Sequence, residues 1–354
     1  MQRILSLATL GVLGGLAWMF LSGGGLNQLA QPSGTAQPPA GSWNSSGTLT
    51  WPAGAPGQPP AGSAPTAATW PGAQAPAMQQ ASAGMTAPPA DFGPTIKIAS
   101  FNIQVFGQKK AADPAVMQAL AAIVRQYEVV AIQEIRTQDD YFIPVFLQLV
   151  NQNGRRYEAL VGPRLGNSRT TEQYAFLYDA ERIACARSSA YTVGDPNNLL
   201  HREPYVATFW MNPAHVNPDF AFSFTLINVH TDPDRGVLPG ELNALAEVYR
   251  VDRRAGANED DVIMLGDFNA DDAHLGRLGQ IPGITPLIRG VFTNTRQNAL
   301  YDNIIIHGPS TTEYAGRSGA FNLMQRLGIS LADAERISDH FPVYAEFSIY
   351  ERDL

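Results

Sequence analysis

The chain has 354 residues, of which 45% are hydrophobic, and its 24 basic and 32 acidic side chains give a net charge of −8. This acidic balance argues against a protein that holds a polyanion through its overall charge, because nucleic-acid binding usually depends on a basic surface. The single cysteine, Cys185, excludes an intramolecular disulfide, so the folded part must be stable from its core alone.

The chain opens on an apolar run of 18 residues, Ile4 to Leu21, which Arg3 precedes. Its length and charge predict that residues 1–22 are either a signal peptide, cleaved near Ser22, or a retained membrane anchor. The arginine places the N-terminus inside and the rest of the chain outside. We therefore expect an exported protein that is secreted, periplasmic or membrane-anchored, with residues 1–22 engaging the membrane or the secretion machinery.

Residues 23–94 are rich in Pro, Ala, Gly, Ser and Gln, and Asp91 is their only charged residue. Such a segment cannot bury enough apolar surface to fold. The sequence therefore predicts a disordered linker over 23–94 and a folded domain over 95–354.

Within the folded domain, six predicted strands each carry a carboxylate, amide or imidazole at one end. The strands are expected at 96–102, 129–134, 222–230, 262–265, 301–306 and 343–347. A buried strand holds a reactive group at its end rigidly, so six such ends together indicate a functional site. The polar residues at these ends are Asn102, Glu134, His230, Asp267 with Asn269, Asp302, and Asp339 with His340.

Helical spacing is found in three places. Pro114 to Tyr127 is the clearest, because Asp113 suits the N-cap and Pro114 suits the first turn. Tyr141 to Leu149 and Pro239 to Arg253 are also expected to be helical.

Eight short motifs follow one another in this domain. They are Phe101-Asn102-Ile103, Ile132-Gln133-Glu134-Ile135-Arg136, Glu172-Gln173-Tyr174-Ala175-Phe176, Arg202-Glu203-Pro204, Val229-His230, Gly266-Asp267-Phe268-Asn269-Ala270-Asp271, Tyr301-Asp302 and Ser338-Asp339-His340-Phe341-Pro342-Val343.

With these motifs the chain resembles the endonuclease/exonuclease/phosphatase superfamily, most closely its deoxyribonuclease I branch, from Thr95 to Ile349. The resemblance implies a fold of the α/β (α+β) class, in which a two-sheet β-sandwich is flanked by helices. It places the site at one edge, between the sheets.

The resemblance also implies a metal site. Glu134 and Asp339 are its expected ligands, and Asn102 is expected to be a further ligand or a phosphate contact. Carboxylate and amide oxygens suit a hard cation, so Mg²⁺ or Mn²⁺ is the expected cofactor and Ca²⁺ a further candidate.

Catalytic and DNA-binding roles follow from the same resemblance. Asp267 and Asn269 would orient water and bind phosphoryl oxygens. Glu172 would pair with His230, and Asp302 with His340, because a carboxylate partner fixes the tautomer of an imidazole. The expected DNA and phosphate contacts are Arg136 and Arg202.

Two positions depart from the pattern of deoxyribonuclease I. Gln104 stands where an arginine is expected near the scissile phosphate, and Thr170 stands where a tyrosine would stack on the sugar. The catalytic centre thus looks intact, while part of the DNA-gripping surface has changed.

The sequence predicts a divalent-metal-dependent deoxyribonuclease that cuts DNA, its expected partner, endonucleolytically and with little sequence preference. One alternative is a phosphodiesterase with another substrate, such as a sphingomyelinase-like enzyme, for which an exposed apolar hairpin would be the sign. Another is a catalytically dead binding module, which would lack a ligand or a histidine.

Overall fold

The computed structural model describes residues 42–43, 49–50, 93–166, 171–255 and 260–352. The predicted signal or anchor, residues 1–22, lies outside these ranges, as does most of the predicted linker. Inside the linker segment, the two-residue strands β1 (Ser42–Trp43) and β2 (Leu49–Thr50) pair antiparallel. Among the described residues there is no helix with the length and apolarity that a membrane crossing requires.

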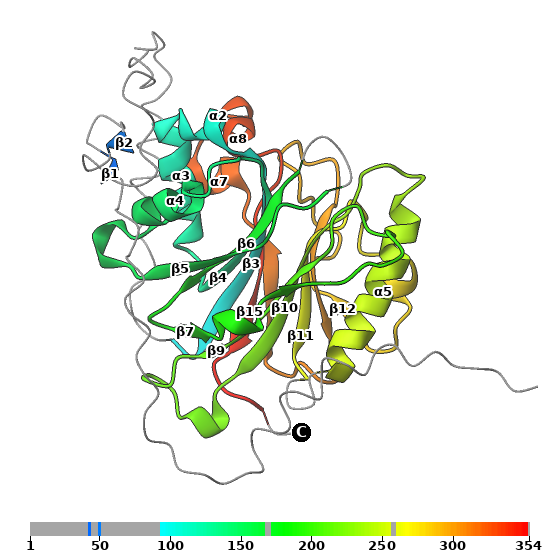
Figure 1. Ribbon diagram of the computed structural model, residues 1–354. Coiled ribbons are helices and arrows are strands. Elements are labelled where there is room, and N and C mark those ends of the chain that lie inside the picture. The colour runs from blue at the N-terminus through cyan, green and yellow to red at the C-terminus, as the bar shows by residue number, and fades with distance from the viewer. Residues whose placement is uncertain (1–41, 44–48, 51–92, 167–170, 256–259, 353–354) are drawn as a thin grey trace, which may run out of the picture. The chain divides into compact units, whose positions relative to one another are not determined.

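The domain is built on two mixed β-sheets (Figure 1). The first has six strands, in the spatial order β14 (Tyr314–Ala320), β15 (Val343–Ser348), β3 (Thr95–Phe106), β4 (Val129–Ile135), β6 (Gln173–Asp179) and β5 (Tyr157–Val161). The second has seven, in the order β12 (Ile284–Pro286), β13 (Asp302–His307), β11 (Val262–Asp267), β10 (Ser223–His230), β9 (Tyr205–Met211) and β7 (Ile183–Cys185), with β8 (Tyr191–Thr192) also paired to β9.

Helices cover the outer face of each sheet (Figure 1). Beside the first sheet are α2 (Gln108–Ala111), α3 (Pro114–Val124), α4 (Phe142–Val150), α7 (Leu323–Leu327) and α8 (Leu331–Ile337). Beside the second are α5 (Leu238–Ala255) and α6 (Gly276–Gly279). Three short 3₁₀ helices complete the described elements: η1 (Gln152–Gly154), η2 (Arg187–Ser189) and η3 (Pro218–Phe220).

The core has three parts. The central part lies between the sheets and contains fully buried aromatic residues such as Phe209, Phe222 and Phe347. Burying each such ring stabilises the fold by about 1.5–3 kcal/mol. The other two parts lie between each sheet and its helices. The predicted two-sheet sandwich flanked by helices is confirmed.

The predicted helices are present with shifted ends. Asp113 caps α3 as expected, its carboxylate accepting a hydrogen bond from the Val116 N–H at 3.3 Å. This helix ends at Val124, three residues before the predicted end. The other two are α4, which begins one residue later than predicted, and α5, which extends beyond both predicted ends.

Strand direction explains why polar residues at opposite ends of different strands meet. β3 and β4 are parallel neighbours, as are β10 and β11, so in each pair the carboxyl ends lie at one edge. β15 is antiparallel to β3 and β13 is antiparallel to β11, so their amino ends lie at the same edge as those carboxyl ends. Asp267 at the end of β11 is therefore directly opposite Asp302 at the start of β13.

Candidate active site

Asn102 and Asp267 join the two sheets at this edge. Asn102 Nδ2, on the first sheet, donates a hydrogen bond to Asp267 Oδ2, on the second, at 3.0 Å, and lies 3.4 Å from Glu134 Oε1. Both Asn102 and Asp267 are buried. The contact fixes the amide and two carboxylates in one place, although 165 residues separate Asn102 from Asp267 in the sequence.

The backbone at Gly266 makes room for Asp267. Gly266 has a φ of +152°, and a Cβ built on it would lie 1.9 Å from the carbonyl oxygen of Val229 on the neighbouring strand. Only glycine fits so close an approach between β10 and β11. The geometry of the two strands therefore requires a glycine directly before Asp267.

Glu172 and His230 form one carboxylate–imidazole pair. Glu172 Oε1 lies 2.6 Å from His230 Nδ1, and both side chains are buried. Burial alone would raise the pKa of Glu172, but the charges of His230, Arg202 and Arg136 outweigh it and bring the pKa to about 2. Because an ionised carboxylate only accepts hydrogen bonds, Nδ1 carries the proton, and Nε2 faces Asp267 Oδ2 at 3.6 Å.

Asp302 and His340 form the second pair. Asp302 Oδ2 lies 2.8 Å from His340 Nδ1, and His340 Nε2 lies 3.6 Å from Asp267 Oδ2. Burial lowers the pKa of His340, but the carboxylates of Asp302 and Asp267 outweigh it and raise this pKa to about 10. The imidazole is therefore cationic at neutral pH.

The two pairs thus point their outer nitrogens at the same oxygen. Asp267 Oδ1 is held by the N–H of Asn269 at 2.9 Å, and Asn269 Nδ2 donates to the Thr231 carbonyl at 3.0 Å. Asn269 has a φ of +47°, a conformation in which asparagine is enriched. These bonds keep Asp267 and Asn269 in fixed orientations between the imidazoles.

Glu134 and Asp339 lie on the other side of Asn102. Glu134 Oε2 accepts from the Val105 N–H at 2.8 Å, and Asp339 Oδ2 accepts from Gln104 Nε2 at 2.8 Å. Burial raises the pKa of Asp339; His340 opposes the rise, while the Glu134 and Asp267 carboxylates add to it. Gln104, which departs from the deoxyribonuclease I pattern, is thus a direct partner of a predicted metal ligand.

The unpaired oxygens here suit a hard cation. Asn102 Oδ1 and Asp339 Oδ1 are buried and have no hydrogen-bond partner among the described residues. Mg²⁺ and Mn²⁺ prefer carboxylate and amide oxygens, so the predicted set of Glu134, Asp339 and Asn102 fits the expected cofactor.

A second reading of the same region places a metal elsewhere. Ligand atoms of Asp267, Asp302 and His340 lie within 4.8 Å of one another. We favour the first set, because all its donors are oxygens, as a hard cation prefers, whereas His340 Nδ1 in the second set is already engaged by Asp302.

The two arginines predicted to contact DNA differ in exposure. The Arg136 side chain is 31% exposed and pairs with Glu134 at 3.2 Å and Glu172 at 3.3 Å. Arg202 is buried; it lies 3.2 Å from Glu172 and donates to the carbonyls of His230 and Thr231. Arg202 therefore supports the Glu172–His230 pair, and its contact with a phosphate stays a prediction.

Below the site, a buried polar network that we did not predict ties the sheets together. Gln133 Nε2 donates to Asn228 Oδ1 at 2.6 Å and to Ser100 Oγ at 3.1 Å. Asn228 Nδ2 donates to the carbonyls of Ile132 and Ala175. The sequence could have predicted this network, because Gln133 and Asn228 are amides inside otherwise apolar strands.

Ser338 and Thr293 hold the loops that carry the second pair, and their roles were also not predicted. Ser338 Oγ donates to the Asn102 carbonyl at 2.7 Å and accepts from the His340 N–H at 3.1 Å. Thr293 Oγ1 accepts from the N–H of Asp302 at 3.1 Å. Hydroxyls in loops carry no periodic signal, so only the structure identifies them.

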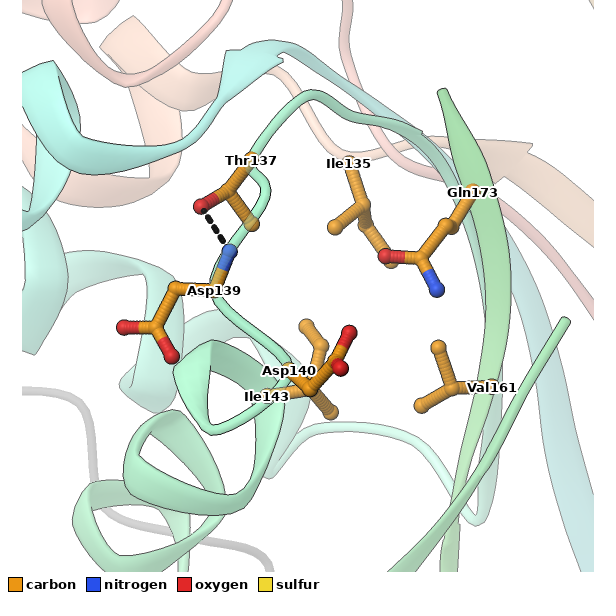
Figure 2. Close-up of a pocket in the computed structure, with 7 residues that line it drawn as sticks. All are labelled: Ile135, Thr137, Asp139, Asp140, Ile143, Val161 and Gln173. Atoms are coloured by element: carbon orange, nitrogen blue, oxygen red, sulfur yellow. Dashed lines mark hydrogen bonds between the residues drawn. The ribbon is translucent and has the colours of Figure 1, made fainter. Parts of the chain in front are cut away.

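A separate pocket of about 160 Å³ lies between α4 and the first sheet (Figure 2). It contains none of the predicted site residues, although two of its lining residues directly follow Glu134 and Glu172 in the sequence. Its lining includes two carboxylates and no basic side chain, which is unfavourable for a phosphoryl group, so we do not assign the reaction to it. The lining residues are Ile135, Thr137, Asp139, Asp140, Ile143, Val161 and Gln173.

Two packed sheets with carboxylates and imidazoles converging at one edge define the class of this protein as a phosphoester hydrolase. The model of the Endonuclease/Exonuclease/phosphatase family matches residues 99–340, and the chain belongs to that family. The resemblance predicted from the motifs is confirmed.

The chain is also similar to individual proteins that are named as deoxyribonucleases. Deoxyribonuclease-1-like 1 of Sus scrofa is 34% identical over 264 residues, which cover 71% of this chain and 81% of that protein. Deoxyribonuclease-1 of Bos taurus is 29% identical over 267 residues, covering 71% of this chain and 92% of that protein. The crystal structure of humanized D. rerio TDP2 matches with a TM-score of 0.51 at 17% identity, over 72% of this chain and 100% of that chain, and supports the fold alone.

Proposed function

We propose that this chain is an exported, divalent-metal-dependent deoxyribonuclease that cuts DNA internally with little sequence preference. The observation that carries the proposal is the convergence of His230 Nε2 and His340 Nε2 on Asp267 Oδ2, at 3.6 Å each. Two imidazoles, one with a free nitrogen and one cationic, suit a reaction that needs both a base and an acid. The naming of the relatives as deoxyribonucleases supports DNA as the substrate.

In this mechanism His230 is the general base. Its Nδ1–H is held by Glu172, so Nε2 is free to take a proton from the water that attacks phosphorus. Cationic His340 then gives its Nε2 proton to the leaving oxygen as the P–O bond breaks, and Asp302 stabilises the charge that it carries before the transfer. General acid–base groups of this kind contribute about 10²–10⁴-fold each.

The remaining residues position the phosphate. Asn269 Nδ2 donates one N–H to the Thr231 carbonyl, and its second N–H can donate to a phosphoryl oxygen, so we assign Asn269 together with Asp267 to orienting water and binding the phosphate. A divalent cation held by Glu134, Asp339 and Asn102 would supply polarisation of the phosphate and neutralise charge on the leaving group.

DNA would approach a site whose surroundings are acidic. With a net charge of −8 the chain lacks a general basic surface, so partly exposed Arg136 and the bound cation would provide the local attraction. An arginine in the minor groove senses groove width and charge more than base identity, which agrees with low sequence preference.

The decisive experiment compares substrates with the full-length protein. Supercoiled plasmid, RNA and sphingomyelin are incubated with Mg²⁺ or Mn²⁺, and with excess chelator. We expect plasmid to pass through a nicked circle to the linear form, with full loss in chelator and recovery on adding Mg²⁺. Full activity in chelator would contradict the metal mechanism. Faster turnover of sphingomyelin than of DNA would favour the alternative substrate, and no turnover of any substrate would favour a binding module.

Export is the part of this proposal that rests on the apolar run Ile4 to Leu21 and Arg3. We expect the chain to be found in membranes or outside the cytoplasm after cell fractionation. Replacing three leucines of the run with aspartate should keep it in the cytoplasm, whereas unchanged distribution would contradict export by this segment.

A further inference from the structure

A second group of carboxylates lies at the other end of the sandwich. Asp261 directly precedes β11, Glu313 directly precedes β14, and Glu351 follows β15. One carboxylate oxygen from each lies within 4.8 Å of the others. Since β11 begins beside Asp261 and ends at Asp267, a strand length of about 20 Å separates this cluster from the candidate active site.

The cluster collects negative charge where water is largely excluded. Asp261 and Glu313 are 2% and 1% exposed, and Glu351 is half-buried. Among the described residues, neither Glu313 nor Glu351 has an ion pair with a lysine or arginine: the nearby Arg352 reaches Glu313 through its backbone N–H, while its guanidinium donates to the Thr312 carbonyl. Like charges held together in a low-dielectric site repel strongly unless a cation compensates them.

Glu313 supplies an independent sign of a ligand site. Its Oε1 accepts from the Arg352 N–H at 2.7 Å and from Thr312 Oγ1 at 3.1 Å. Its Oε2 is buried and has no hydrogen-bond partner in the part of the chain that the structure describes. Leaving a buried acceptor unpaired is unfavourable, and more so when the acceptor is charged, so a bound cation or a proton would stabilise this oxygen.

We propose that Asp261, Glu313 and Glu351 bind a structural divalent cation of the Ca²⁺ type. All three donors are oxygens, which excludes a preference for soft metals. Ca²⁺ takes about six to eight oxygen ligands in a flexible geometry, whereas Mg²⁺ is usually bound through one or two carboxylates and keeps several waters. Three converging carboxylates, with half-exposed Glu351 leaving a side open to water, therefore fit Ca²⁺ better.

The proposed ion would fasten the C-terminal segment to both sheets. Glu351 is already held on the second sheet, where its Oε1 accepts from the Ser223 N–H at 2.8 Å. Glu313 leads into the first sheet and Asp261 into the second. A cation shared by the three would therefore stabilise the sandwich at the end away from catalysis, whatever substrate the enzyme uses.

The test uses the full-length protein stripped of metal by a chelator and then dialysed. Melting temperatures are measured with added Ca²⁺, with Mg²⁺, and with KCl at matched ionic strength, and Ca²⁺ binding is followed by calorimetry. The variants are Glu313→Gln, Glu351→Gln and Glu134→Gln, which removes a proposed ligand of the catalytic cation. Glu335→Gln on α8 is the matched control, because Glu335 pairs with Arg296 and belongs to neither group of converging carboxylates.

We expect Ca²⁺ to raise the melting temperature of the wild type, Glu134→Gln and Glu335→Gln by about 3–8 °C, and Mg²⁺ to raise it less. Glu313→Gln should lose this response and, in chelator, be at least as stable as the wild type, because one repelling charge is gone. Glu351→Gln should bind Ca²⁺ about tenfold more weakly.

Two results would overturn the proposal. One is the absence of any calcium response in the wild type at about 10 mM, above the weak end of the range for extracellular calcium modules. The other is an undiminished response in Glu313→Gln. If Glu313→Gln does not fold, an undiminished response in Glu351→Gln overturns the proposal in its place, and a weakened one supports it.

Discussion

The imidazoles of His230 and His340 both face the carboxylate of Asp267. Their hydrogen-bond partners, Glu172 and Asp302, influence the protonation of each imidazole. In the proposed mechanism, Glu172 holds the proton of His230 on Nδ1, and Nε2 would act as the base. Asp302 and Asp267 together favour the cationic form of His340, which would act as the acid. The surroundings of the two imidazoles would thus give them opposite proton-transfer roles.

We predict that His230→Ala and His340→Ala each lower kcat by about 10²–10⁴-fold. Groups that act as one unit are non-additive, so the double variant should be little slower than the slower single one. Single-turnover cleavage of supercoiled plasmid measures the effect, and thermal melts show that the variants fold. The matched control is His274→Ala, whose side chain is 78% exposed and pairs with Asp271, and it should cleave like the wild type. A folded His230→Ala variant with wild-type cleavage would refute the assignment.

The low pKa of Glu172 predicts how stability depends on pH. Because this pKa is about 2 when folded and about 4.5 ordinarily, ionised Glu172 stabilises the fold above pH 4.5 and loses that contribution as pH falls toward 2. The contribution is at most about 3 kcal/mol. The Glu172→Gln variant has no carboxylate to titrate at this position. The difference in the free energy of unfolding between wild type and variant should therefore become smaller from pH 7 to pH 3. Urea unfolding in chelator measures the gap, and parallel pH profiles would contradict the prediction.

At the scale of strands and helices, the sequence predicted which segments carry the site but not how they face one another. The six expected strands correspond to β3, β4, β10, β11, β13 and β15, each with bounds within a few residues. Alternation and apolar runs reveal a strand, because its two faces meet different surroundings. They say nothing of strand direction, which is set by long-range pairing, so without the family resemblance the residues would have remained six separate polar ends.

Shorter or atypical strands escaped prediction for a local reason. β14 contains two glycines, and none of its residues is fully buried, so it has no buried face to create a period. Carboxylate–imidazole pairing was predicted only through the resemblance, since Glu172 and His230 are 58 residues apart. The Gln133–Asn228 link is likewise a property of two packed sheets, and no single strand encodes it.

The junction of β10 and β11 offers a test of how closely the backbone supports the site. Gly266→Ala would put a Cβ against the Val229 carbonyl at a φ of +152°, so we expect a loss of about 2–4 kcal/mol in the free energy of unfolding. Cleavage should fall as well, because Asp267 is the next residue. Gly240→Ala in α5 is the control: its Cβ would meet nothing within 4 Å, and helix propensity makes the change neutral or stabilising by up to about 1 kcal/mol. Equal unfolding curves for both variants would contradict the steric argument.

At the scale of the whole molecule, the folded domain and the preceding segment differ in composition. Residues 1–94 hold two charged side chains, Arg3 and Asp91, while the remainder holds 23 basic and 31 acidic ones. The structure refines where the domain begins. The Gly93 carbonyl accepts from Arg182 Nη2 at 3.1 Å, and the Pro94 carbonyl accepts from the Ile349 N–H at 3.2 Å. These two residues are therefore bonded to the domain, although the sequence assigned them to the linker.

Two deletions separate the linker from the domain at this boundary. Removing residues 1–92 should leave melting temperature and plasmid cleavage unchanged while abolishing membrane association and export, because the hydrogen bonds that hold the candidate site join residues of the domain itself. Removing residues 1–94 also deletes the Gly93 and Pro94 carbonyls, and at about 0.5–1.5 kcal/mol for each hydrogen bond the domain should lose about 1–3 kcal/mol. Arg182 keeps its bonds to the Thr95 carbonyl and Glu128, so the shorter protein should still fold and cleave. Chemical denaturation and cleavage of the two proteins side by side measure both effects.

An insoluble or inactive 93–354 fragment would show that the preceding residues belong to the folded unit. Identical stability of the two fragments would show that the Gly93 and Pro94 bonds contribute nothing.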